Sequence, residues 1–126
     1  MPFRDIYGQE HAIGLLNQAV HRDRMPHAWL FTGQANIGKY KTAVALAQKL
    51  NCRKGEKDAC GECDYCLQIV EQNFLDYQVL IPDGKFIKID QIRKALNWLH
   101  LHPDQAKKRV MIIDGAQHLG REAANA

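Results

Sequence analysis

Gly33-Gln34-Ala35-Asn36-Ile37-Gly38-Lys39-Tyr40 is the stretch of this chain that decides the fold. It matches the phosphate-loop pattern G-x-x-x-x-G-K through Gly33, Gly38 and Lys39. In such a loop, backbone N–H groups and the N-terminus of the next helix converge on phosphate oxygens, and the lysine adds a positive charge. Asn36 replaces a usual glycine and tolerates left-handed backbone angles better than most residues. The stretch therefore predicts a nucleotide-binding loop.

Two positions depart from the pattern of a nucleotide-hydrolysing enzyme. Tyr40 stands where a Ser or Thr hydroxyl normally holds Mg²⁺, and a phenol oxygen cannot take that place. Asp114 ends an apolar stretch and fits a Mg²⁺-binding carboxylate, although a carboxylate that caps a turn would look the same. Gly115 follows it, where a glutamate would polarise the attacking water. We expect no hydrolysis and no bound Mg²⁺, and leave open whether the loop binds ATP or ADP.

The elements around the loop alternate between apolar runs of strand length and helical stripes. A strand directly before the glycine loop and a helix directly after it strengthen the phosphate-loop interpretation. Alternation of this kind predicts an α/β fold with a parallel sheet flanked by helices. The predicted strands are 28–32, 77–81 and 109–114, and the predicted helices are 9–22, 38–50, 67–70 and a last one that begins with Asp90 as N-cap and ends near Pro103.

All four cysteines lie between positions 52 and 66, as Cys52-x₇-Cys60-x₂-Cys63-x₂-Cys66. Two-residue spacers let neighbouring thiolates wrap one tetrahedral zinc ion. A reducing compartment disfavours disulfides, and a catalytic thiol would not need three companions. The spacing therefore favours a structural zinc module inserted at about 52–66, with free thiols or another metal as the alternatives.

Composition limits the classes of protein that the chain can belong to. With 126 residues, 46% hydrophobic and 25% charged, it is expected to fold as one domain or part of one. A net charge of +3 is too mild to indicate nucleic-acid binding by itself. The N-terminus lacks the apolar core of a secretory signal, so the cytoplasm is the expected compartment. The helix-like end at 121–126 has no stop signal, and we expect 1–126 to be the front part of a longer domain.

With these motifs placed, the chain resembles the bacterial clamp-loader AAA+ subunits of DNA polymerase III. The resemblance covers nearly all 126 residues. The stretches that carry it are Phe3–Glu10, Pro26–Gly33, Asn51–Cys52, Cys60–Cys66, Ile87–Arg93 and Glu122–Ala126.

The resemblance implies an AAA+ P-loop fold and a place in a nucleotidyltransferase holoenzyme that replicates DNA. Subunits of the gamma/tau type carry Thr or Ser after the loop lysine and Glu after the strand-end Asp, so Tyr40 and Gly115 favour the non-hydrolysing delta prime type. Its implied partners are the gamma/tau and delta subunits, the sliding clamp and primer–template DNA, which Lys85, Lys88 and Gln91 would contact without sequence preference. The alternative is an active gamma/tau-type ATPase, whereas a zinc-bearing nucleic-acid module would leave the loop unexplained.

The resemblance also implies that strands 28–32 and 110–114 normally flank a later strand that this chain lacks. Unpaired backbone groups between them would be costly. We therefore expect rearrangement, pairing with a neighbouring chain, or an incompletely described sheet.

Overall fold

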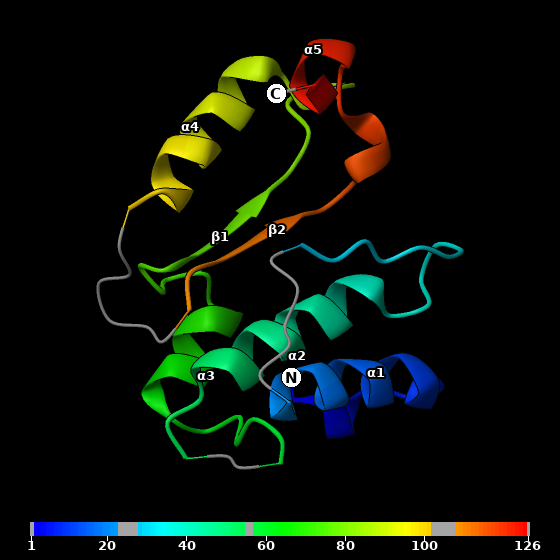
Figure 1. Ribbon diagram of the computed structural model, residues 1–126, viewed down its shortest axis with the longest axis vertical. Coiled ribbons are helices and arrows are strands. Elements are labelled where there is room, and N and C mark those ends of the chain that lie inside the picture. The colour runs from blue at the N-terminus through cyan, green and yellow to red at the C-terminus, as the bar shows by residue number, and fades with distance from the viewer. Residues whose placement is uncertain (1, 23–27, 55–56, 102–107, 126) are drawn as a thin grey trace. The chain divides into compact units, whose positions relative to one another are not determined.

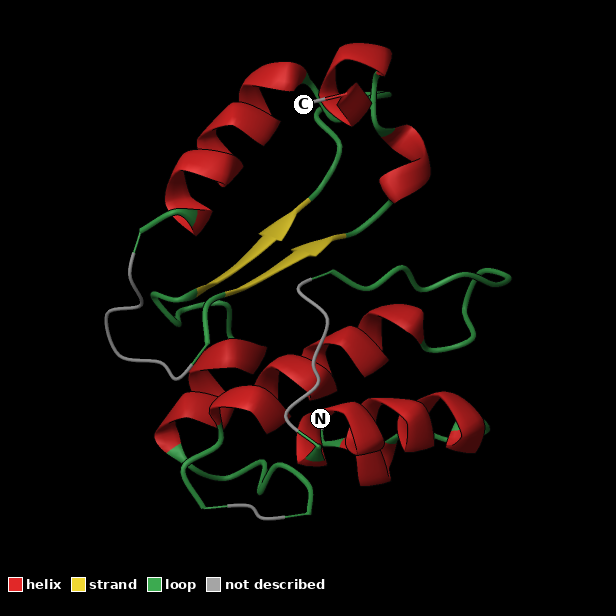
Figure 2. Cartoon of the chain, viewed as in Figure 1, coloured by secondary structure: helices red, strands yellow, loops and turns green. Residues whose placement is uncertain are grey.

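The computed structural model describes residues 2–22, 28–54, 57–101 and 108–125 (Figure 1). It divides into two compact units, Met1–Asn73 and Phe74–Ala126, and each is described by itself. Helices and one small parallel sheet make up the regular structure, so the predicted α/β class is confirmed at that level (Figure 2). Among the described residues, no helix is both long and apolar enough to cross a membrane.

The first unit is helical. Its elements are the short 3₁₀ helix η1 (Phe3–Asp5), α1 (Glu10–His21), α2 (Lys39–Asn51) and α3 (Asp64–Val70). The predicted helices at 9–22, 38–50 and 67–70 are therefore confirmed, with small shifts at their ends. Apolar side chains from η1, α1 and α2 form one core, whose buried members are Phe3, Leu16, Ala45 and Leu46.

The prediction of a strand at 28–32 is wrong. The segment has no regular structure, and Trp29 and Leu30 are exposed, while Phe31 alone packs partly against the core. A strand needs a hydrogen-bonded neighbour, and the described part of Met1–Asn73 holds no other strand. An apolar run indicates that a segment can form a strand, but the strand forms only where a second strand pairs with it.

The second unit contains the sheet. Its elements are β1 (Tyr77–Leu80), α4 (Ile89–Leu99), β2 (Val110–Ile113), the 3₁₀ helix η2 (Ala116–His118) and α5 (Arg121–Asn125). The strands pair in parallel, with register Tyr77↔Val110 through Leu80↔Ile113, as the sequence predicts for 77–81 and 109–114. A small core joins the sheet to α4 and α5, with Ile87, Ile92 and Ala123 at its centre.

The start of α4 differs from the prediction. Lys88, in extended conformation, is the N-cap, and Asp90 lies inside the first turn. The side-chain oxygen of Gln91 accepts the Lys88 backbone N–H at 2.9 Å, so Gln91 satisfies the helix start that Asp90 was expected to cap. The helix ends at Leu99, and Pro103, the predicted end, lies outside the described residues.

A buried ion pair fixes the second unit at the start of both strands. The Asp76 side chain is 0% exposed and that of Arg109 is 7% exposed, and their closest N···O distance is 2.8 Å. The same guanidinium donates to the Trp98 carbonyl near the end of α4 at 2.6 Å and stacks 4.7 Å from the Trp98 ring. The pair therefore locks the helix end onto the edge of the sheet.

Candidate functional site

The predicted phosphate loop enters α2 in the way the pattern requires. Gly38, with φ 95°, is the N-cap of α2, and Asn36 adopts φ 62°. Gly33 has φ 146°, and a side chain there would also collide with the Ile37 side chain. The backbone angle therefore favours glycine at the first position of the loop, whereas the terminal methyl group of Ile37 could rotate away from a side chain there. A helix N-terminus follows the turn, which is the arrangement that favours an anion.

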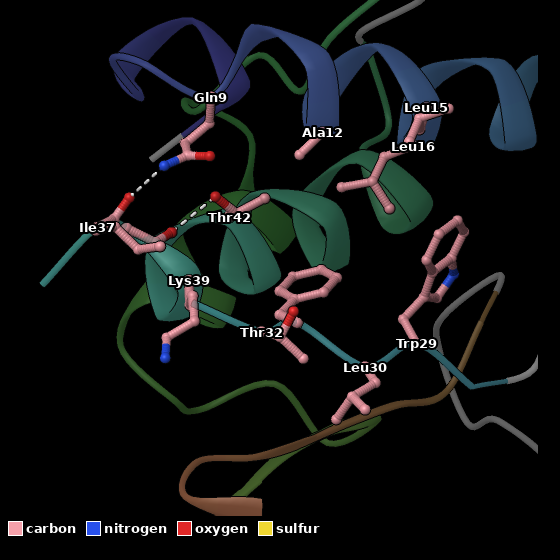
Figure 3. Close-up of a pocket in the computed structure, with 12 residues that line it drawn as sticks. Gln9, Ala12, Leu15, Leu16, Trp29, Leu30, Thr32, Ile37, Lys39 and Thr42 are labelled. Carbon is pink, nitrogen blue, oxygen red and sulfur yellow. Dashed lines mark hydrogen bonds between the residues drawn. The ribbon is translucent and has the colours of Figure 1, made fainter. Parts of the chain in front are cut away.

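Side chains of Lys39 and Gln9 hydrogen-bond to carbonyl groups of the turn. The Lys39 ammonium donates to the Gly33 carbonyl at 2.7 Å, so it joins the start of α2 to the first residue of the loop. Gln9, just before α1, donates from Nε2 to the Ile37 carbonyl at 2.9 Å (Figure 3). The Thr42 hydroxyl donates to the Gly38 carbonyl at 2.7 Å, within its own helix. Thr42 lies two positions beyond Tyr40, about 200° further around α2, so its hydroxyl does not take the place of the one missing at Tyr40.

A cavity of about 210 Å³ adjoins the loop. Figure 3 shows Ala12, Leu15 and Leu16 of α1 on one side and Trp29, Leu30 and Thr32 on the other, with Lys39 at the end near the loop. The site therefore combines a glycine turn at a helix N-terminus with an apolar wall, and a nucleotide site would need both.

Asp114 belongs to the second unit and follows β2. Its backbone N–H donates to the Leu80 carbonyl at 2.9 Å, which continues the parallel ladder, and its side chain is exposed. Gly115 has φ 96°, and a Cβ on it would stand 3.1 Å from Cδ2 of His118 and 3.6 Å from Cγ of Pro82. A glutamate at this position would therefore be strained in its backbone and crowded at its first carbon.

The residues expected to contact DNA lie around the start of α4. Lys85 and Lys88 are exposed, and the Lys88 ammonium is 3.5 Å from Asp83. Gln91 uses its amide within the fold: besides accepting from Lys88, it donates from Nε2 to the Ile81 carbonyl at 2.9 Å. DNA contact by these three residues stays a prediction.

The four cysteines come together as the spacing predicts. Their sulfurs all lie within 4.8 Å of one another, and Cys60 Sγ and Cys66 Sγ are 4.0 Å apart. None of the four forms a disulfide. Sulfurs bound tetrahedrally at about 2.3 Å from zinc would be about 3.8 Å apart, so this cluster needs only small shifts to hold the ion. The donor set and its size therefore fit zinc.

Local secondary structure sets the position of each thiol. Cys52 caps the end of α2, Cys63 is the N-cap of α3, and Cys66 lies in the first turn of α3. Backbone N–H groups of Glu62 and Cys63 donate to Cys60 Sγ at 3.4 and 3.2 Å. Donors of this kind stabilise negative charge on sulfur, which a metal-binding thiol must carry.

The cluster also changes the acidity of its thiols. Burial tends to raise the pKa of Cys63, but backbone hydrogen bonds from Arg53 and Cys66 outweigh it and the pKa falls below its usual value. Burial raises the pKa of Cys66, which is 0% exposed. One thiol of the cluster is thus prepared for ionisation and another is held neutral, and a bound cation would favour ionisation of both.

Sequence reasoning missed the residues that hold the cysteine-bearing loop. Arg4 donates to the carbonyls of Ala59 and Cys60 at 2.7 and 2.8 Å, and Asp58 accepts the backbone N–H groups of Phe3 and Arg4 at 3.1 and 3.0 Å. The partners are more than fifty positions apart in the chain, and no local pattern marks such a pair.

Together these features define an α/β protein in which a glycine turn feeds a helix and that helix leads into a four-cysteine cluster. The sequence model of the family described as "DNA polymerase III, delta subunit" matches residues 8–126. The chain therefore belongs to this family.

Three similar proteins carry names from the same polymerase. The chain is 34% identical to DNA polymerase III subunit gamma of Buchnera aphidicola subsp. Acyrthosiphon pisum, over 98% of this chain and 34% of that protein. It is 34% identical to subunit tau of Escherichia coli, over 98% of this chain and 19% of that protein. It is 32% identical to subunit delta' of Bacillus subtilis, over 93% of this chain and 36% of that protein. The chain thus spans about a third or less of these relatives.

Proposed function

We propose that the protein is a clamp-loader subunit of DNA polymerase III of the delta prime type, which keeps a phosphate loop but does not hydrolyse ATP. The observation that carries the proposal is Gly115. It follows the strand-end Asp114 with φ 96° and with His118 only 3.1 Å from a would-be Cβ. A general base must reach the attacking water, and this position neither carries a side chain nor has room for one without strain.

The start of α2 supports the same conclusion. Tyr40 places a phenol where Mg²⁺ requires a short hydroxyl side chain, and Thr42, two positions on, lies about 200° further around the helix. The anion-binding part of the site depends on backbone angles and on Lys39, so these changes leave it intact. Phosphate binding without turnover is the function that this combination favours, with Gly33, Asn36, Gly38 and Lys39 as the binding residues and Asp114 as a remnant.

We also propose that the cysteine cluster holds a structural Zn²⁺ ion, with Cys52, Cys60, Cys63 and Cys66 as ligands. Four sulfur ligands complete a tetrahedral set and leave no open position for a substrate or a water, so the ion would brace the helix ends and not catalyse. As a cytoplasmic stator, the protein would pack beside gamma/tau and delta subunits and help place the sliding clamp on primed DNA, with Lys85, Lys88 and Gln91 toward the phosphates.

Reconstituted clamp loading tests this assignment. The protein is mixed with gamma/tau, delta, the clamp and primed DNA, and ATP-dependent clamp deposition is measured. Lys39→Ala in this protein should leave the loading rate within about twofold, since its own hydrolysis is not used, whereas the matching lysine variant of gamma should abolish loading. Failure of the protein to join the complex, or loss of loading with Lys39→Ala, would contradict the proposal.

The competing function is an active ATPase of the gamma/tau type, and the 34% identity to gamma and tau subunits favours it. Under this alternative a ligand other than residue 40 would hold Mg²⁺. Turnover by the protein alone separates the two.

A further inference from the structure

The N-terminal segment, residues 2–9, touches both candidate sites of the first unit. At one end it binds the loop that carries Cys60, through Arg4 and Asp58. At the other end it reaches the phosphate loop, where Gln9 donates to the Ile37 carbonyl at 2.9 Å. Phe3, between them, is 4% exposed in the core that α1 and α2 share. One short segment therefore contacts the metal cluster, the core and the anion-binding turn.

The contact at the cysteine end is close on both sides. Each Asp58 oxygen accepts backbone N–H groups: Oδ1 those of Phe3 and Ala59 at 3.1 and 2.7 Å, and Oδ2 that of Arg4 at 3.0 Å. The Arg4 guanidinium bonds two successive carbonyls and lies 3.5 Å from Asp58. A Cβ on Gly61, in the loop between two cysteines, would stand 3.0 Å from Cγ of Pro2. The segment thus fixes the backbone on both sides of Cys60.

The contact at the phosphate end is also direct. Cγ2 of Ile6 lies 3.8 Å from the position that a Cβ on Gly38 would take, so the Ile6 side chain lies against the start of α2. Ile6 and Phe31 both pack on the core cluster, one before the loop and one from the segment that leads into it. If residues 2–9 move, the support of the turn at Ile37 and Gly38 moves with them.

We infer that residues 2–9 couple the cysteine cluster to the phosphate loop, with Arg4 and Asp58 as positioning residues for the metal-binding loop. In this account, metal binding fixes the loop that carries Cys60. Arg4 and Asp58 then hold residues 2–9 against that loop, and Ile6 and Gln9 of the same segment order the phosphate loop. The inference rests on the proposed zinc site. Residues beyond the direct ligands commonly change metal affinity by about 10- to 100-fold, which is the range expected here.

The experiment uses Co²⁺ as a spectroscopic probe for the thiolate site and amide hydrogen exchange for the loop. The variants are Arg4→Gln and Asp58→Asn, with Arg4→Lys as a milder change. Arg22→Gln is the matched control, because Arg22 is an exposed arginine of the same unit that follows α1 and belongs neither to residues 2–9 nor to the cysteine-bearing loop. Circular dichroism checks that each variant keeps its helices.

In the wild type, metal should slow exchange in both 3–9 and 33–39, relative to the reduced, chelated protein. Arg4→Gln and Asp58→Asn should bind Co²⁺ about 10- to 100-fold more weakly. At saturating metal they should no longer show the slowing at 33–39, while exchange in the buried part of α2 stays unchanged. Arg22→Gln should behave like the wild type.

Three results would overturn the inference. If amide hydrogen exchange at 33–39 in the wild type did not depend on metal, the coupling would be disproved and the proposed zinc site would still stand. Equal Co²⁺ affinity in wild type and Arg4→Gln would remove the positioning role. Absence of thiolate-to-Co²⁺ absorption in the wild type would remove the metal site itself, and with it the proposed zinc function.

Discussion

Each unit of the molecule contains an arginine–aspartate pair, and the two pairs lie in opposite settings. In Phe74–Ala126 the side chains of Arg109 and Asp76 are 7% and 0% exposed, at 2.8 Å. In Met1–Asn73 those of Arg4 and Asp58 are 55% and 22% exposed, at 3.5 Å. A buried charge without its partner is costly, whereas water replaces the partner of an exposed one. The same residue types therefore form a buried pair beside the sheet in one unit and a partly exposed pair between the N-terminal segment and the cysteine-bearing loop in the other.

Removing Asp76 gives the largest expected effect. Asp76→Ala leaves the Arg109 guanidinium buried without its counter-charge, and the free energy of unfolding should fall by about 3–5 kcal/mol. Urea denaturation measures it. The matched control is Asp90→Ala, which breaks the exposed 3.8 Å pair with Arg93 and should change stability by about 0–1 kcal/mol. Equal effects of the two substitutions would contradict the distinction between a buried and an exposed ion pair.

Metal removal should lower the stability of one unit and leave the other unchanged. A ligand at about 100 times its dissociation constant stabilises the folded state by about 2.7 kcal/mol, so chelation should cost Met1–Asn73 a loss of that order. Exchange in β1 and β2 should not change. Cys66→Ser should reproduce the effect without chelator, and a loss spread evenly over both units would contradict the assignment of the cluster to the first.

Two glycine substitutions should act in opposite directions within the first unit. Gly33→Ala meets φ 146° and the Ile37 side chain, and should cost about 1–3 kcal/mol together with loss of ADP binding. Gly14→Ala lies within α1, where a Cβ meets nothing within 4 Å, and should add about 0.5–1 kcal/mol. Thermal unfolding and calorimetric ADP titration measure both. Unchanged ADP affinity in Gly33→Ala would mean that the turn does not bind the phosphates.

Removing Arg4 should have the smallest effect on global stability. Arg4→Gln breaks a half-exposed pair and should lower the free energy of unfolding by about 0–1 kcal/mol, far less than Asp76→Ala. Urea denaturation of the two variants side by side tests the contrast. A loss with Arg4→Gln as large as that with Asp76→Ala would mean that the Arg4 contact stabilises the whole fold as strongly as the buried pair does.

Patterns that depend on neighbouring residues were predictable from the sequence. The helix after Lys39 follows from strong helix formers behind a glycine, and the cysteine cluster follows from spacers that bring thiols together. The strands at β1 and β2 follow from apolar runs that pair with each other within one unit. In these cases the information needed for the structure lies within the local sequence or within one unit.

Features that depend on distant partners were not predictable. The 28–32 run has strand composition but no strand partner among the described residues of its unit, and it is irregular. Asp90 has the residue type of an N-cap, yet the helix begins after Lys88, whose backbone N–H is accepted by the Gln91 side chain. The contact of Arg4 with the Cys60 loop spans 56 positions and involves carbonyls, which no sequence pattern displays.

Steady-state ATP hydrolysis by the purified protein, compared with Lys39→Ala under the same conditions, decides whether the phosphate loop is a binding site or an enzyme. Because residue 40 offers no short hydroxyl and residue 115 offers no base, wild type and Lys39→Ala should both stay at the buffer rate, with and without primed DNA. Turnover by the wild type that disappears in Lys39→Ala would contradict this and would identify the protein as an active ATPase.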